Sequence, residues 1–261
     1  MSIITLTTDF GTGSPYVAAM KGVILAINPA VTLVDLTHDV RPQDVRQGAL
    51  ILEDVADCFP PDTIHVTVVD PGVGTDRAVV CARLGRQRHV APDNGLLSRL
   101  ARRHPPSELI RLTEPAYWRH PVSATFNGRD IMAPAAAWLS LGVEPARLGS
   151  PMERLVDLDW PEARLGSGRI EGQVLAVDSF GNLITNITAD LLAEVPHHQE
   201  TQITIGDRQI AGISHTYGNR PAGSLIALIG SSGRLEVAIV GGSAAATLRL
   251  GVGAPARVRW I

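Results

Sequence analysis

The sequence is poor in several kinds of residue, and each shortage argues against a class of protein. Only 4% of its 261 residues are aromatic and only two are cysteines, Cys58 and Cys81. Both cysteines lie in apolar surroundings without CxxC or Cys/His spacing, so we expect buried free thiols in a reducing cytoplasm and no metal site. No apolar run approaches a membrane span, and the N-terminus lacks a signal-peptide pattern, so we expect a cytoplasmic protein with no membrane partner.

The chain also lacks a large excess of either positive or negative charge. The net charge is −3, and the arginines are scattered along the chain instead of gathered in one segment. Such a chain lacks the electrostatic footprint of a nucleic-acid-binding protein, so we expect no nucleic-acid partner. Since 45% of the residues are hydrophobic, the chain can bury a sizeable core, and a small molecule is the favoured ligand.

The first half of the chain alternates short β-branched runs with helical patterns, which is the rhythm of a βαβ sheet. We predict strands at residues 3–7, 31–36 and 64–69, and helices at 16–28, 44–58 and 130–142. The later part reads as short strands separated by Gly, Asn, Asp and Ser. The pattern predicts an α/β domain with a mainly parallel sheet over residues 1–162 and a small antiparallel β-barrel over residues 163–261.

The stretch IHVTVVDPGVGTDRAVV, at residues 64–80, places charge where an apolar strand ends. Asp70 follows the strand directly, and in open α/β sheets such ends face the ligand crevice. Arg77 lies beyond a Gly-rich turn that can fold it back onto the same place. The stretch alone leaves two interpretations open, a functional pair or a turn aspartate with a surface arginine.

Asp9 ends the first predicted strand and precedes Gly11 and Gly13. A carboxylate there can accept hydrogen bonds from a ribose diol, and the small turn lets a ligand approach the backbone. The third glycine of the dinucleotide fingerprint is missing, so NAD is disfavoured, and the glycines also fit a simple turn.

The segment DSFGN places Asp178, Phe180 and Asn182 close together. It offers an aromatic face for stacking beside amide and carboxylate hydrogen-bonding groups, as a purine nucleoside requires. In a chain with so few aromatic residues Phe180 is conspicuous, although the same sequence also fits a structural phenylalanine at a corner of the barrel.

The chain resembles the S-adenosyl-L-methionine (SAM) hydroxide adenosyltransferase family, or SAM hydrolases, which are related to SAM-dependent fluorinating and chlorinating enzymes. The resemblance spans nearly the whole chain and rests on the ordered segments TDFG, VDLTHDV, VVDPGVGTDR, APDNGLL, TFNGRDIMAPAAA, DSFGNLITNI and SSGRLEVAIVGGSAA. It implies SN2 attack of water or hydroxide on the ribose C5′ of SAM, giving adenosine and L-methionine without a cofactor or metal. It also implies a homotrimer, with each site between the N-terminal domain of one subunit and the C-terminal domain of its neighbour.

By this resemblance Asp70 and Arg77 are two members of the family's Asp-Arg-His set. Asp70 would hold the water or accept its proton, and Arg77 would favour hydroxide-like charge. The third position holds Asn127, where hydrolase relatives have histidine, and an amide cannot take a proton near neutral pH. His120 is an alternative source of a histidine.

The resemblance also distributes the substrate contacts over both domains. Asp9 would bind the ribose hydroxyls, with Phe126 near the adenosine in the same subunit. Tyr16, His38 and Asn94 belong to matching segments and are expected to have structural roles. The neighbouring subunit would contribute Asp178, Phe180 and Asn182 to the methionine part and the adenine, Ser231 to the methionine carboxylate, and Val240 and Gly241 near the adenine.

Two other functions are open at this point. A non-catalytic SAM- or adenosine-binding protein is compatible with asparagine at position 127. A SAM-dependent halogenase is disfavoured, because halogenating relatives carry tyrosine at the position of Asp70 and fluorinating ones a serine at that of Gly128.

Overall fold

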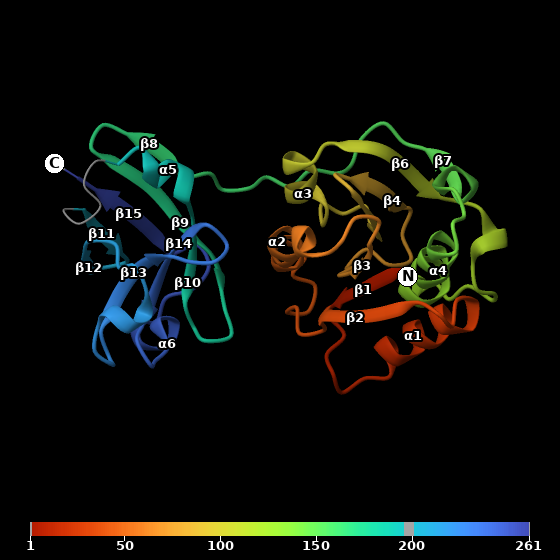
Figure 1. The fold of residues 1–261 in the computed structure, drawn as a ribbon, viewed down its shortest axis with the longest axis horizontal. Helices are drawn as coiled ribbons and strands as arrows, with labels where there is room; N and C mark the ends of the chain where they lie inside the picture. Colours follow the sequence, from red (N-terminus) through yellow and green to blue (C-terminus); the bar gives the residue numbers. More distant parts are fainter. Residues whose placement is uncertain (1, 196–200, 261) are drawn as a thin grey trace. The chain divides into compact units, whose positions relative to one another are not determined.

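The computed structural model describes residues 2–195 and 201–260. The chain divides into two compact units, Met1–Leu158 and Asp159–Ile261, which run from red to green and from green to blue in Figure 1. Each unit has its own hydrophobic core and is described by itself.

The first unit is built on a seven-stranded mixed sheet of order β2-β1-β3-β5-β4-β6-β7 (Figure 1). The strands are β1 (Ile3–Thr8), β2 (Thr32–Thr37), β3 (Ile64–Val68), β4 (Val79–Leu84), β5 (Gln87–Pro92), β6 (Pro106–Leu112) and β7 (Gly149–Pro151). Pairing is parallel from β2 through β1 and β3 to β5, and antiparallel beyond. The carboxyl ends of these four strands therefore share one edge of the sheet.

Helices cover both faces of this sheet. They are α1 (Tyr16–Ile27), α2 (Val45–Val55), α3 (Ser98–Arg103) and α4 (Ala133–Ser140), with the 3₁₀ turns η1 (Ala56–Cys58), η2 (Pro115–Tyr117) and η4 (Pro145–Arg147) and the π-helical turn η3 (Gly128–Met132). α1 and α4 share one core cluster with β1 and β3, whereas α2 and α3 pack on the opposite face against β4. Asp44 caps α2 by accepting a hydrogen bond from the Gln47 N–H.

The second unit is an antiparallel sheet of order β12-β11-β15-β9-β10-β14-β13, with β8 added on β9. Its strands are β8 (Arg164–Gly166), β9 (Arg169–Val177), β10 (Leu183–Thr188), β11 (Gln202–Ile205), β12 (Arg208–Ala211), β13 (Leu225–Ile229), β14 (Arg234–Ile239) and β15 (Pro255–Arg259), with short helices α5 (Ala189–Ala193), α6 (Ala244–Leu248) and η6 (Tyr217–Asn219). A bridge between Ser214 and Leu228 connects the segment after β12 to β13, so the sheet is nearly closed into a barrel. The predicted fold class is confirmed.

Two local predictions need correction. The helix expected over residues 130–142 begins earlier, as the π-helical turn η3, and continues as α4. Cys58 is exposed because it ends the surface turn η1, whereas Cys81 is buried on β4 as expected, and both thiols are free. Burial raises the pKa of Cys81 to about 12. None of the helices within residues 2–195 and 201–260 has the length and apolarity that crossing a membrane requires.

Two histidines are buried side by side in the first sheet. His65 on β3 and His89 on β5 pair directly, and their rings stack with centroids 4.8 Å apart. Thr5 on β1 bonds His65 Nδ1 at 2.8 Å, whereas both ring nitrogens of His89 lack a hydrogen-bond partner among the described residues. Burial lowers the pKa of His65 to about 4 and that of His89 well below its usual 6.5, so both are neutral at physiological pH.

This pair predicts an acid-sensitive fold. The unfolded chain protonates both histidines near pH 6.5 and the folded chain does not, so stability is lost as the pH falls from about 6.5 toward 4. Each histidine contributes a slope of about 1.4 kcal/mol per pH unit to the free energy of unfolding in that window. Urea denaturation at several pH values measures the slope. His89→Leu is expected to reduce the slope by the contribution of one histidine.

The matched control is His215→Asn, because His215 is exposed in the second unit. This change should leave the slope as in the wild type. A wild-type slope that His89→Leu does not alter would contradict the assignment of acid sensitivity to the buried pair.

Candidate active site

Asp70 and Arg77 form a buried ion pair just beyond the end of β3. Arg77 Nε lies 2.9 Å from Asp70 Oδ1, and Arg77 Nη2 also donates to Asp70 Oδ2, so the pairing is bidentate. The side chains are only 5% (Asp70) and 12% (Arg77) exposed, which excludes the interpretation as a surface pair. Arg77 Nη2 also donates to Asn127 Oδ1 at 2.8 Å, which brings the three expected catalytic residues together.

The turn between Asp70 and Arg77 packs closely against the loop that carries Asn127. Gly74 has a φ of +82°, and a Cβ there would lie 2.8 Å from the Ala124 carbonyl oxygen. Only glycine accommodates both the dihedral angle and this approach. On the other side, Asn94 Nδ2 donates to the Val69 carbonyl at 2.9 Å and holds the chain directly before Asp70.

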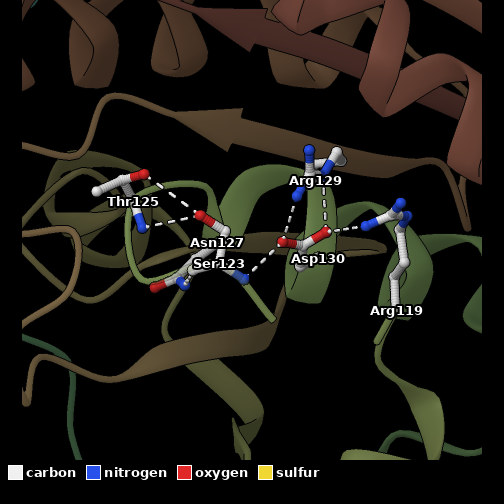
Figure 2. Close-up of polar contacts among 6 residues, drawn as sticks. All are labelled: Arg119, Ser123, Thr125, Asn127, Arg129 and Asp130. Carbon is white, nitrogen blue, oxygen red and sulfur yellow. Dashed lines mark hydrogen bonds and ion pairs between the residues drawn. The ribbon is translucent and has the colours of Figure 1, made fainter. Parts of the chain in front are cut away.

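Asp130 anchors the loop that presents Asn127 (Figure 2). Its fully buried carboxylate accepts two hydrogen bonds from Arg129, at 2.7 and 2.8 Å, one from Arg119 at 3.1 Å and one from the Ser123 N–H at 2.9 Å. Burial alone would raise the pKa of Asp130, but these bonds outweigh it and lower the pKa below its usual range. The Ser123 carbonyl in turn accepts from Asn127 Nδ2 at 3.2 Å, so the anchor fixes the amide.

Asp9 lies on the same sheet edge as Asp70. Thr8 pairs with Val68 in the parallel β1/β3 ladder, so the residues after both strands emerge side by side. Asp9 Oδ2 accepts from the Gln43 N–H at 2.8 Å, and Gln43 has an uncommon positive φ of 66°. One carboxylate of the site is thus oriented by a backbone amide, and the other by a guanidinium.

Three aromatic rings from segments far apart in the sequence pack together beside residues of the site. Phe10, Tyr16 and Phe126 pack edge-to-face, with centroids 5.3 to 5.8 Å apart, and Tyr16 is half exposed. Phe10 follows Asp9 and Phe126 precedes Asn127. Of these three, only Phe126 is expected from the sequence to lie near substrate. The scarcity of aromatic residues, already notable for Phe180, could have drawn attention to the other two.

His120 does not join the cluster through any contact the structure gives it. Its ring is exposed, and Nε2 lies 2.9 Å from the Pro115 carbonyl oxygen in its own loop. His38 is buried, with Nδ1 3.0 Å from Thr8 Oγ1 and Nε2 3.1 Å from Asp35 Oδ1. Within the described parts of the chain, no group of three or more His, Cys, Asp or Glu residues is arranged to hold a metal ion.

The second unit contains a pocket of about 870 Å³. Five of the residues expected to bind substrate line it: Asp178, Phe180, Asn182, Ser231 and Gly241. Val240 is not among the lining residues and packs instead against Ile226, Leu228 and Ala238. The structure therefore gathers the expected residues of this unit except Val240.

Asp178 organises the turn beside this pocket. Its Oδ1 accepts from the backbone N–H groups of Phe180 and Asn182 at 2.9 and 2.8 Å, and its Oδ2 accepts from Asn182 Nδ2 at 2.8 Å. The turn leaves the Phe180 ring 78% exposed. An aromatic ring this exposed is available for stacking.

Glu236 and Tyr217 also line the pocket, and neither is expected from the sequence. The Tyr217 hydroxyl donates to Glu236 Oε1, and Glu236 is only 6% exposed. Burial, together with the bond to Glu236, raises the pKa of Tyr217 to about 12, so the phenol stays protonated. The signal in the sequence was a lone charge within the apolar run LEVAIV.

Comparison with known proteins covers both units. The family model described as SAM hydroxide adenosyltransferase N-terminal domain matches residues 4–149, and the corresponding C-terminal domain model matches residues 172–257. The (R)-S-adenosyl-L-methionine hydrolase of Thermus thermophilus is 41% identical over 99% of this chain and 100% of that protein. The enzyme of the same name from Salinispora tropica is 38% identical, over 98% and 97%. A fluorinase from Actinoplanes sp. is 28% identical, over 78% and 77%.

Solved structures agree with this match. An uncharacterized conserved protein from Thermotoga maritima superposes with a TM-score of 0.92 at 32% identity, covering 99% of this chain and 100% of that chain. A conserved hypothetical protein from Thermus thermophilus gives a TM-score of 0.80 at 40% identity, with the same coverage.

The hydrogen bonds of buried Asp130 predict that a small substitution there lowers the stability of the fold strongly. Asp130→Asn removes the charge that Arg129 and Arg119 surround, and we expect it to lower the free energy of unfolding by about 3 kcal/mol. Chemical denaturation measures the loss. The control, Asp157→Asn, breaks an exposed ion pair with Arg102 and should cost under about 1 kcal/mol. Equal losses in the two variants would contradict the anchoring role.

Proposed function

The chain belongs to the SAM hydroxide adenosyltransferase family and hydrolyses SAM. We propose that Asp70 and Arg77 hold the attacking water and that Asn127 positions Arg77. The products are adenosine and L-methionine, formed by attack of water or hydroxide on the ribose C5′. The observation that carries the proposal is the buried cluster of these three side chains beyond the end of β3.

The chemistry places modest demands on the protein. The sulfonium of SAM leaves as a neutral thioether, so the leaving group needs no proton. The protein must hold a water in line with C5′, accept the proton that the water loses as its oxygen bonds to carbon, and favour hydroxide-like charge on that oxygen. A carboxylate can hold the water and take its proton, and a guanidinium beside it favours the hydroxide-like charge.

Asp70 is the group proposed to hold the water. Each of its oxygens accepts one hydrogen bond from Arg77, and a carboxylate oxygen has a second lone pair that can accept from water. A water that donates to Asp70 keeps its own lone pair free to attack. Arg77 then places a fixed positive charge beside the oxygen that becomes hydroxide-like.

Asn127 is proposed as a positioning residue. Its Oδ1 accepts from the same Arg77 nitrogen that contacts Asp70, so it fixes the rotation of the guanidinium. An amide cannot act as the base near neutral pH, but it can supply this acceptor. Asparagine at this position is thus compatible with hydrolysis by the Asp70–Arg77 pair.

The binding residues divide between the two units. We propose that Asp9 binds the ribose hydroxyls and that Phe126, with Phe10 and Tyr16, lies near the adenosine. The pocket of the second unit, with Asp178, Phe180, Asn182, Ser231 and Gly241, would take the rest of SAM; Val240 would act through the backbone beside Gly241. SAM is substrate, and the mechanism uses no additional cofactor.

The assembly is also part of the proposal. We propose a homotrimer in which the first unit of one subunit and the second unit of its neighbour complete each site, as the family resemblance implies. Light scattering of the purified protein gives the oligomeric state directly. A cytoplasmic location, favoured by the cysteine pattern, completes the proposal.

Replacement of Asp70 tests the catalytic pair. With purified protein and SAM, we expect adenosine and methionine in equal amounts by chromatography, unchanged by added chloride. Asp70→Asn keeps the shape of the side chain and removes its charge, so kcat should fall by about 100-fold or more with a smaller change in KM. The control is Asp62→Asn, an exposed aspartate paired with Arg83, which should retain full activity. Chloride-dependent 5′-chloro-5′-deoxyadenosine would instead indicate a halogenase.

Substitution of Asn127 separates hydrolysis from binding alone. Asn127→Ala removes the acceptor from Arg77 and should lower kcat by about 10-fold, whereas Asn127→His restores the residue of the hydrolase relatives and should remain active. SAM binding without adenosine from the wild type, but adenosine from Asn127→His, would mean that this chain is a binding protein. That result would overturn the proposed function.

A further inference from the structure

Glu236 is a charged residue buried against the pocket of the second unit. It lies on β14 between Leu235 and Val237 and is 6% exposed. Tyr217 donates to its Oε1, whereas Oε2 lies close to Gly230, where a Cβ would be only 2.5 Å from that oxygen. Glycine at position 230 therefore leaves space for the second carboxylate oxygen.

The pocket carries two carboxylates that differ in how far their hydrogen-bonding capacity is used. Asp178 receives three hydrogen bonds from its own turn. From the described residues Glu236 receives one, from Tyr217 to Oε1, so Oε2 can accept another. Among the described residues that line the pocket there is no lysine or arginine, so the fixed charge of the lining is negative. A pocket of this kind favours a cationic group.

The position of Glu236 relative to Ser231 indicates which cation. An α-amino acid carries its ammonium and its carboxylate on the same carbon, so the groups that bind them must be neighbours. Ser231 is the proposed contact of the methionine carboxylate, and it directly follows Gly230, against which Glu236 Oε2 lies. A ligand whose carboxylate contacts Ser231 thus brings its ammonium toward Glu236.

We propose that Glu236 binds the α-ammonium group of the methionine part of SAM and so determines specificity for the intact amino acid. Tyr217 fixes one carboxylate oxygen and leaves the other for the ligand. The inference rests on the proposed function, because it takes the pocket of the second unit as the methionine side of the site. Burial and the nearby Asp178 raise the pKa of Glu236, and an ammonium in contact opposes both effects.

Glu236→Gln tests the proposal because it keeps the size of the side chain and its bond from Tyr217 while removing the charge. We expect kcat/KM for SAM to fall roughly 10- to 100-fold, mainly through KM. For the deaminated analogue, in which a 2-oxo group replaces the ammonium, kcat/KM should change less than about 2-fold. By calorimetry, affinity for L-methionine should fall by the same factor as kcat/KM for SAM, and affinity for adenosine should not change.

Matched variants give the controls. Glu171→Gln, at a partly exposed residue on β9, should behave as the wild type in every assay. Glu236→Asp keeps the charge and should retain more discrimination between SAM and its deaminated analogue than Glu236→Gln does. Circular dichroism verifies folding, and if Glu236→Gln does not fold, the aspartate variant and Tyr217→Phe are compared instead; both should weaken L-methionine binding and spare adenosine binding.

Several results would overturn the inference. Equal losses of kcat/KM for SAM and for its deaminated analogue in Glu236→Gln would mean that Glu236 does not bind the ammonium. A loss of adenosine affinity with unchanged L-methionine affinity would place Glu236 against the base. If the wild type does not cleave SAM, the proposed function fails, and L-methionine calorimetry on the same variants still decides the role of Glu236.

Discussion

The bidentate contact between Arg77 and Asp70 is the interaction on which the candidate active site depends. Both side chains are largely withdrawn from water, and two charges taken out of water are tolerated only when their geometry and hydrogen bonding are nearly complete. Neighbouring residues complete the hydrogen bonding and hold the two side chains in place. Asn127 accepts from the guanidinium, Asn94 holds the chain before Asp70, and Gly74 lets the turn close against the neighbouring loop.

The loop from Arg119 to Asp130, which presents Asn127, also contains a buried charge whose hydrogen bonding is nearly complete. Asp130 is more deeply buried than Asp70 and carries more hydrogen bonds, and it contacts none of the residues proposed to touch the water. Its effect passes through Ser123, whose N–H it binds and whose carbonyl holds the Asn127 amide. The π-helical turn that follows, η3, is a form often found at functional sites, and here it begins directly after Asn127.

The two units contribute different chemistry. The first offers paired charges, Asp9 on a backbone amide and a cluster of aromatic rings, which suit a ribose and a reacting carbon. The second offers a pocket with an exposed Phe180, hydrogen-bonding side chains and a net negative lining, which suit a base and an amino acid with a positive charge. Gly128 adds a restriction in the first unit: a Cβ there would meet Val68 at 3.3 Å and Met20 at 3.4 Å, so a serine at this position would have to displace its neighbours.

The sequence by itself determined the fold class, because period-2 and period-3.6 patterns report local preferences that the packed domains kept. It also determined the order of motifs, the placement of Asp9 and Asp70 after strands and the asparagine at position 127. Tertiary structure alone decided which side chains meet. The bond from Arg77 to Asn127 spans 50 residues of sequence, and the triangle of Phe10, Tyr16 and Phe126 depends on how α1 and η3 pack.

The same distinction explains the differences from expectation. Cys58 is exposed and Val240 packs outside the pocket lining, although both lie in apolar stretches, because burial depends on the neighbours that other segments supply. Glu236 is the opposite case, a charge within a strand whose burial and Tyr217 contact follow from how the barrel brings η6 beside β14. Local sequence specifies the elements, whereas strand order and register specify the contacts, since these join residues that no local pattern connects.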